Sequence, residues 1–251
     1  MKNNKIANQY NKHGFIILNR LINPSLIKKV LIEFYEFIKD QTKKEGLRID
    51  DDIDQMIINI MKPETKLRSF VYDTIRYNWN LQNIIYSKDF SHILQMIGFR
   101  QPMALEHSTI RIDIPNETKF ITPPHQDIRS VRSKKCVTIW FPLRECNEKS
   151  GTMAVYSKSH KVGLRGYKFL GTQNAIPEKD QHTLKEYERI VIKAKPGDVV
   201  FMNSFLIHES VPSNNLPIKL NGQIIINDAM EIKYLDKFYR MNKVLETKDL
   251  L

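Results

Sequence analysis

The sequence predicts a mainly β protein with flanking helices: a barrel or double-sheet jelly roll that follows a helical first third. This prediction comes from a change in the pattern of apolar residues near residue 103. Before that point apolar residues recur at helical spacing, and after it short β-rich runs alternate with turn residues. With 251 residues, of which 41% are hydrophobic, the chain is long enough to bury one full core.

The helical part, residues 1–102, is expected to support the β part. Residues 14–18 form a short apolar strand pattern near its start. A helix then begins at Asn23-Pro24, because asparagine is a good N-cap and proline suits the first helical position. Further apolar patterns at helical spacing cover residues 52–61, 66–78 and 89–97.

Eight β-rich runs follow, at residues 105–114, 124–128, 136–143, 152–156, 189–194, 198–202, 207–211 and 218–227. They define an expected β-roll core at residues 103–228 and leave residues 229–251 as a C-terminal extension of a single domain, 1–251. The segment 158–188 lies between the fourth and fifth runs. It is long enough to serve as a lid or substrate loop.

Three residues within the second and seventh runs suggest a metal site. His125 and Asp127 point to the same face if residues 125–127 are extended, because strand side chains alternate with period two. His208 follows 81 positions after Asp127 (208 − 127). In a roll of two Greek keys the second and seventh strands can be neighbours. Two histidines and one carboxylate hold non-haem Fe(II) and leave coordination positions open.

Seven segments of the chain occur in an order typical of one family: residues 10–18, 111–115, 125–127, 138–143, 150–153 with 159–161, 195–201 and 208–210. In these segments the chain resembles the phytanoyl-CoA dioxygenase family of Fe(II)/2-oxoglutarate-dependent oxygenases, over nearly its whole length. The resemblance implies a double-stranded β-helix, a cupin-like jelly roll. It also implies that His125, Asp127 and His208 bind the iron.

The resemblance further implies a site for the cosubstrate 2-oxoglutarate. In the family, its far carboxylate meets an arginine about eleven positions after the second histidine and a hydroxyl two positions after it. Ser210 matches the hydroxyl, but Lys219 stands where the arginine is usual. Lysine neutralises a carboxylate as a point charge without the bidentate fork. The match at Lys219 competes with another interpretation, in which Asn221-Gly222 forms a hairpin turn.

Two further residues are candidates for the cosubstrate pocket. The resemblance puts Trp140 beside 2-oxoglutarate, and the alternative is ordinary core packing. Arg111 lies in a strand among apolar neighbours, where a buried arginine needs an anionic partner. That partner is the cosubstrate, the substrate, Asp113 or Asp198. Gln126 should point away from the metal and form local hydrogen bonds.

The function implied is a dioxygenase that uses Fe(II), 2-oxoglutarate and O2 to hydroxylate a small or carrier-linked organic substrate, with release of succinate and CO2. Asp127 favours hydroxylation, or an allied oxidation such as desaturation or ring closure, over halogenation, because halogenating relatives have a small residue at this position. The alternative is a non-catalytic metal-binding β-roll that acts as a sensor or scaffold. The missing peroxisomal address at the C-terminus argues against the lipid role that gives the family its name.

The net charge of +11 raises the possibility of nucleic-acid binding. The basic residues are spread along the whole chain, and no aromatic-basic platform or helix-turn-helix pattern accompanies them. A basic rim for an anionic small substrate is the preferred interpretation. Two cysteines, no signal core and no membrane-spanning run predict a cytoplasmic protein. No pattern indicates a particular oligomeric state.

Overall fold

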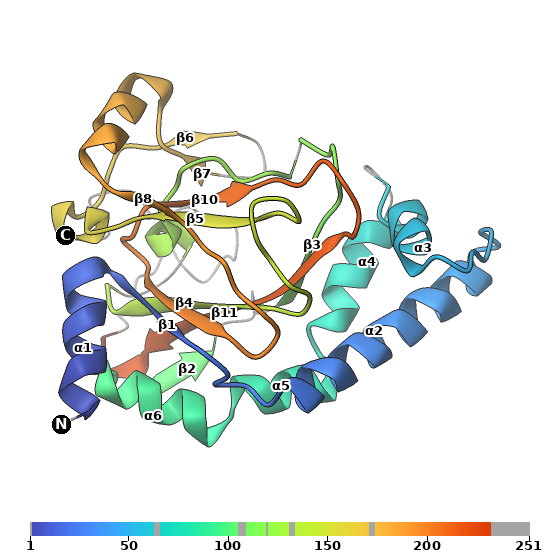
Figure 1. Ribbon diagram of the computed structural model, residues 1–251, viewed down its shortest axis with the longest axis horizontal. Helices are drawn as coiled ribbons and strands as arrows, with labels where there is room; N and C mark the ends of the chain where they lie inside the picture. The colour runs from blue at the N-terminus through green and yellow to red at the C-terminus, as the bar shows by residue number, and fades with distance from the viewer. Residues whose placement is uncertain are drawn as a thin grey trace, which may run out of the picture.

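The computed structural model describes residues 2–62, 66–104, 109–118, 120–130, 134–170 and 174–231. Figure 1 shows a large sheet in the middle of the molecule, with helices along one side and a smaller sheet on the other. The α-helices within these ranges are α1 (Lys2–His13), α2 (Pro24–Lys44), α3 (Ile53–Ile60), α4 (Lys66–Ile75), α5 (Trp79–Ile85) and α6 (Lys88–Met96). Short 3-10 helices are η1 (Asp127–Ser130), η2 (Ser159–Val162), η3 (Glu178–Glu186) and η4 (Ala229–Glu231).

Two antiparallel sheets form the roll. The large sheet has the order β1 (Phe15–Leu18), β9 (Val199–Asn203), β4 (Cys136–Pro142), β11 (Lys219–Asp228) and β2 (Pro102–Ala104), and β3 (Thr109–Asp113) also pairs with β11. The small sheet has the order β10 (His208–Val211), β5 (Thr152–Tyr156) and β8 (Arg189–Val191). Strands β6 (Lys168–Phe169) and β7 (Asn174–Ala175) form a separate pair.

The large sheet is buried on both faces, which explains its nearly continuous apolar strands. Trp140 and Met202 face the small sheet and pack with Met153 of β5. The alternate residues face the helices: Phe201 of β9 meets Phe90 of α6, with ring centroids 5.6 Å apart. The mainly β, jelly-roll prediction with a helical first third is therefore confirmed.

Most of the expected elements are present, with shifted ends. The Asn23 side chain accepts a hydrogen bond from the Ser25 amide at 2.9 Å, so the predicted cap of α2 is confirmed. Helices α1 and α5 were not expected. The run expected at 105–114 appears as β3, while residues 105–108 lie outside the described ones. The same holds for residues 232–251, most of the expected C-terminal extension.

The strand expected at 124–128 is wrong. His125 makes a single antiparallel bridge with His208, and the chain then turns into η1 at Asp127. Pro123 and Pro124 offer no backbone N–H groups, so no regular ladder forms before His125, although the carbonyl of Thr122 still accepts from the Ser210 amide at 2.9 Å. The Ile128 amide instead donates to the carbonyl of Ser204 at 3.0 Å.

The hairpin turn considered at Asn221-Gly222 is also wrong, because both residues lie inside β11 and pair with β3 and β4. Glycine is required at 222 since a Cβ there would collide with the Phe141 ring. Lys219 is the first residue of β11, and without the turn it remains the candidate for the position where the family usually has an arginine.

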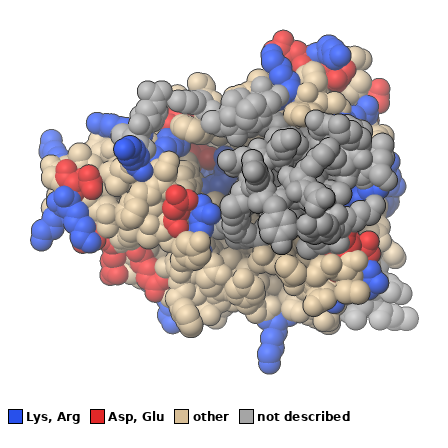
Figure 2. Space-filling model, turned by 180° about the vertical axis from the view of Figure 1, so that it is seen from behind, with Lys and Arg blue, Asp and Glu red and all other residues tan. Residues whose placement is uncertain are grey.

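The segment 158–188 carries its own elements, η2, the β6–β7 pair and η3, and residues 171–173 within it lie outside the described ones. No described helix is both long and apolar enough to cross a bilayer. On the face drawn in Figure 2, basic and acidic side chains are interspersed, and no continuous basic stripe crosses the described residues.

Candidate metal centre and its pocket

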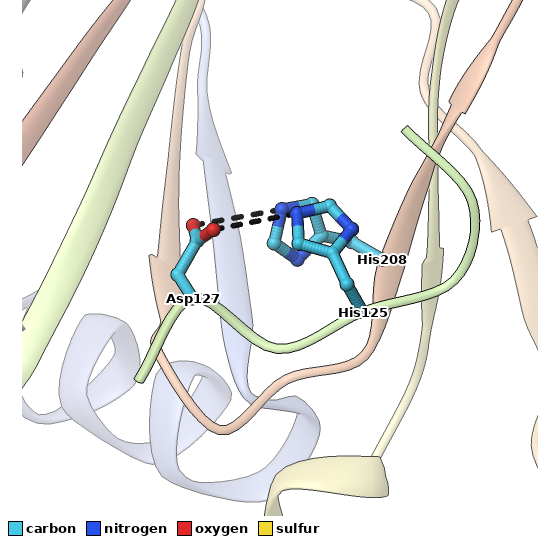
Figure 3. Close-up of side chains that lie close together, drawn as sticks. All are labelled: His125, Asp127 and His208. Carbon is cyan, nitrogen blue, oxygen red and sulfur yellow. Dashed lines mark ion pairs between the residues drawn. The ribbon is translucent and has the colours of Figure 1, made fainter. Parts of the chain in front are cut away.

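His125, Asp127 and His208 come together at one place, as Figure 3 shows. Their candidate ligand atoms all lie within 4.8 Å of one another. Nε2 of His125 is 3.4 Å from Oδ1 of Asp127, and Nε2 of His208 is 3.5 Å from Oδ2. Among the described residues, this is the one group of three His, Cys, Asp or Glu side chains arranged to hold a metal ion.

The backbone bridge brings the two histidines together. The His125 amide donates to the His208 carbonyl at 3.0 Å, and the His208 amide donates back at 3.1 Å. Their rings therefore lie on the same side of the bridge, with centroids 4.1 Å apart. The turn into η1 directs Asp127 towards both rings, although a regular strand was expected to do so.

A second set of contacts fixes the orientation of each ligand. Nδ1 of His125 is 2.8 Å from the carbonyl oxygen of Pro123, and Nδ1 of His208 is 3.1 Å from that of Leu206. A carbonyl only accepts hydrogen bonds, so each Nδ1 carries the proton and each Nε2 keeps a free lone pair. The carboxylate of Asp127 accepts a hydrogen bond from Oγ1 of Thr138 at 2.5 Å.

The electrostatics of the site favour the protonation states that bind a cation. Burial alone would raise the pKa of Asp127, but His208, His125 and the Thr138 hydroxyl hold that pKa well below its usual range. Burial, together with the neighbouring His125, lowers the pKa of His208 to about 4. At neutral pH the site therefore offers one carboxylate and a neutral His208 imidazole, as a divalent metal requires.

A pocket between the sheets adjoins the two histidines of the triad. Its walls come from β3, β4, β5, β9, β10, β11 and the loop before His125. They comprise Arg111, Asp113, Thr122, His125, Thr138, Trp140, Met153, Met202, His208, Glu209, Ser210, Lys219, Asn221 and Gln223. All four residues suggested for the cosubstrate (Arg111, Trp140, Ser210 and Lys219) therefore lie on one pocket. Trp140 also packs in the inter-sheet core, so its two interpretations are compatible.

Lys219 is buried in this pocket and forms an ion pair with Asp113 of β3. Its ammonium group also donates to the carbonyl of Thr152 at 3.0 Å. Burial would raise the pKa of Asp113, but Lys219 and Arg111 lower it. The Lys219–Asp113 pair was not predicted, although the register of β3 against β11 puts the two residues directly opposite each other.

Arg111 is less buried than expected, with 32% of its side chain exposed. Its Nη2 lies 3.7 Å from Oδ1 of Asp113 and donates to the carbonyl of Phe120 at 3.4 Å, so both contacts are long. Asp198 is not its partner, because that carboxylate accepts from the amides of Arg20 and Lys195.

Asn221 is a pocket residue that the sequence did not reveal, because its Asn-Gly pair resembles a turn. It is 1% exposed, and neither its amide nitrogen nor its amide oxygen has a hydrogen-bond partner among the described residues. A buried amide without partners costs about 1–3 kcal/mol for each unmet group. In a pocket wall, such a group can be satisfied by a polar ligand or by a water molecule.

The β-roll and the group of two histidines and one carboxylate define a class of protein: the non-haem Fe(II)/2-oxoglutarate-dependent oxygenases. The sequence identifies the family within this class. The profile of the phytanoyl-CoA dioxygenase (PhyH) family matches residues 10–216, and the chain belongs to this family.

Known relatives agree with this assignment. The 1-deoxypentalenic acid 11-beta-hydroxylase of Streptomyces arenae is 24% identical over 220 residues, which cover 81% of this chain and 72% of the relative. The solved epimerase SnoN, in complex with Fe3+, alpha ketoglutarate and nogalamycin RO, superposes with a TM-score of 0.65. Its identity is 14%, over 98% of this chain and 91% of that one. The carbocyclase SnoK gives a TM-score of 0.56 at 18% identity, over 90% and 83%. At these identities the two structures show the shared fold.

Proposed function

We propose that this protein is an Fe(II)/2-oxoglutarate-dependent dioxygenase that hydroxylates a small or carrier-linked organic substrate, with release of succinate and CO2. The observation that carries the proposal is the convergence of Nε2 of His125, Nε2 of His208 and the carboxylate of Asp127. The backbone holds both imidazoles in the tautomer that leaves Nε2 free for a metal.

The donor set fits Fe(II). Two imidazole nitrogens and one carboxylate match the ligand type that non-haem iron enzymes use, and they leave positions open for other ligands. When bound, iron with 2-oxoglutarate and O2 supplies the oxidising chemistry that converts a substrate C–H bond to C–OH. The task of His125, Asp127 and His208 is to hold the metal, while Thr138 fixes the carboxylate.

The pocket beside the triad fits 2-oxoglutarate. Glu209, which also lines the pocket, pairs with Arg189. Lys219 and Arg111 therefore carry two positive charges against the negative charge of Asp113, and this balance favours one further carboxylate. We assign the far carboxylate of the cosubstrate to Lys219, with Ser210 beside it. The unpartnered Asn221 amide supports a polar ligand at the same wall.

We assign Arg111 to the binding of an anionic group on the substrate. It is the more exposed of the two pocket cations, and among the described residues its long contacts leave most of its N–H donors available to a ligand. The relative from Streptomyces arenae is named for an acid that it hydroxylates, which agrees with this assignment. The carboxylate at 127 favours hydroxylation or an allied oxidation over halogenation, and within that set the relative's name favours hydroxylation.

The first experiment is an anaerobic titration of the metal-free protein with Fe(II) and 2-oxoglutarate, followed by succinate release in air. We expect the visible charge-transfer band of the iron–cosubstrate chelate in the wild type. Asp127→Ala should abolish both the band and succinate, whereas Asp51→Ala, at an exposed loop position, should change neither. A folded wild type that binds iron but forms no band would instead support the non-catalytic metal-binding module.

A further inference from the structure

Gln126 stands between two of the candidate metal ligands but takes no part in the metal site itself. It is 6% exposed, and its side chain forms three hydrogen bonds. Its amide nitrogen donates to the carbonyls of Phe205, at 2.6 Å, and Gly163, at 2.9 Å. Its amide oxygen accepts from the backbone amide of Arg165 at 2.8 Å.

These three bonds join three separate stretches of chain. Gln126 belongs to the 125–127 motif, and Phe205 lies three positions before His208 (208 − 205). Gly163 and Arg165 belong to the segment 158–188. One buried side chain therefore connects both ligand-bearing stretches to that segment. The expectation of purely local hydrogen bonding for Gln126 is wrong.

The segment contacts each ligand-bearing stretch a second time. The amide of Ile176 donates to the carbonyl of Pro124, next to His125, at 2.7 Å. The amide of Ile207, next to His208, donates to Oγ of the fully buried Ser159 at 2.8 Å. Ile176 and Ile207 also pack in one apolar cluster with Leu184. The contacts therefore include polar bonds and buried apolar surface on both sides of the triad.

We propose that the segment 158–188 is a brace for the metal centre, and that Gln126 is the positioning residue that couples the two. The inference rests on the proposed metal site. Because the bonds of Gln126 hold the backbone of both ligand-bearing stretches, a change in the segment alters the spacing of the ligands. By reciprocity, a metal held by the triad orders the segment. A substrate that shifts the segment thereby changes the metal site.

The test uses Mn(II), a redox-stable probe, added to the full-length protein without 2-oxoglutarate. Gln126→Met keeps the side-chain length and removes all three bonds, and Mn(II) affinity should fall at least about tenfold, as it does for residues that orient metal ligands. Gln82→Met is the matched control. Gln82 also donates to a backbone carbonyl, that of Arg76, but in the helical region, and its substitution should leave Mn(II) affinity unchanged.

Hydrogen exchange separates coupling from a general loss of structure. In the wild type, Mn(II) should slow exchange at the amides of Arg165 and Ile176, and in Gln126→Met this protection should disappear. Ser159→Ala provides a second variant should Gln126→Met fail to fold, and it should weaken Mn(II) binding several-fold because the Ile207 amide loses its acceptor.

Wild-type Mn(II) affinity in either folded variant would overturn the brace. Exchange at the amides of Arg165 and Ile176 that does not respond to Mn(II) in the wild type would do the same. These outcomes differ from a failure of the proposed function. A wild type that binds Mn(II) with the expected coupling but releases no succinate contradicts the dioxygenase alone. A wild type that binds neither Mn(II) nor Fe(II) removes the metal site on which both rest.

Discussion

His208 shows how one buried side chain links stability, pH and metal binding. Burial next to His125 lowers its pKa to about 4, and the neutral imidazole is also the form that binds a metal. Burial would raise the pKa of Asp127, but the neighbouring side chains lower that pKa by more and keep the carboxylate ionised. Both residues are buried, yet at neutral pH His208 is neutral and Asp127 is ionised, because their partners differ.

The His208 pKa predicts that the metal-free protein loses stability as pH falls from about 6.5 towards about 4. In the unfolded chain His208 takes up its proton near pH 6.5, and in the folded chain only near pH 4, so acid favours unfolding in this window. Urea unfolding of the wild type and of His208→Gln at several pH values tests this. The variant should show a flatter pH dependence, and equal slopes would contradict the assignment.

Lys219→Ala should raise the 2-oxoglutarate concentration needed for half-maximal succinate release at least about tenfold, because a charge-assisted contact contributes about 1.5–3 kcal/mol. Lys219→Arg keeps the charge and should lose less, and Lys193→Ala, at an exposed position, is the control. Since the Ala variant leaves Asp113 without its closest cation, unfolding is measured in parallel. An unchanged 2-oxoglutarate requirement would move the far carboxylate to Arg111.

At the scale of the elements, a polar network attaches the helical region to the roll next to β11. The guanidinium of Arg144 lies 2.7 Å from Asp54 of α3 and donates to the carbonyl of Ile218 at 3.0 Å. The other oxygen of Asp54 accepts from the Ile218 amide at 3.1 Å. Ile218 precedes Lys219, so this network fixes the point where the proposed cosubstrate lysine enters the pocket.

Arg144→Met should lower the free energy of unfolding by about 3–5 kcal/mol, because it leaves the buried Asp54 without its cation. Arg100→Met is the matched control: its pair with Glu231 is exposed and should contribute less than about 1 kcal/mol. Chemical denaturation measures both. If Arg144→Met lowers the free energy of unfolding no more than Arg100→Met does, then water must solvate Asp54 once its cation is removed.

At the scale of the whole molecule, the candidate metal site joins stretches that are far apart in the chain. His125 and Asp127 precede β4, whereas His208 begins β10. An ion held by all three would tie the two stretches together at the edge of the small sheet, where the described backbone contributes the His125–His208 bridge and the bond from the Ser210 amide to the Thr122 carbonyl. Metal binding should therefore stabilise the folded chain as a unit.

We expect Mn(II) at about one hundred times its Kd to raise the free energy of unfolding by about 2.7 kcal/mol, through preferential binding to the folded state. EDTA should reverse the gain. Asp127→Ala should show no gain, and thermal unfolding with and without Mn(II) provides the comparison. A stabilisation that persists in Asp127→Ala would mean that the ion binds elsewhere.

The features that could be predicted from the sequence were local ones. The Asn23-Pro24 cap, the β-rich runs and the His-x-Asp motif are short patterns whose meaning depends on neighbouring residues. The run at 124–128 was misinterpreted because its apolar and polar residues fit a strand, while Pro123 and Pro124 at its start prevent a regular ladder. Asn221-Gly222 has the composition of a turn, yet the Phe141 ring requires that glycine within β11.

Residue type and order were sufficient to predict a jelly roll and its helical support from periodicity, and the triad of His125, Asp127 and His208 from side-chain chemistry together with the resemblance of seven segments to one family. Packing in three dimensions added the Lys219–Asp113 pair, the unpartnered Asn221 and the cross-link through Gln126. Each of these depends on which strand or segment lies opposite a given residue. That pairing is set by contacts between residues distant in the chain, which no local pattern encodes.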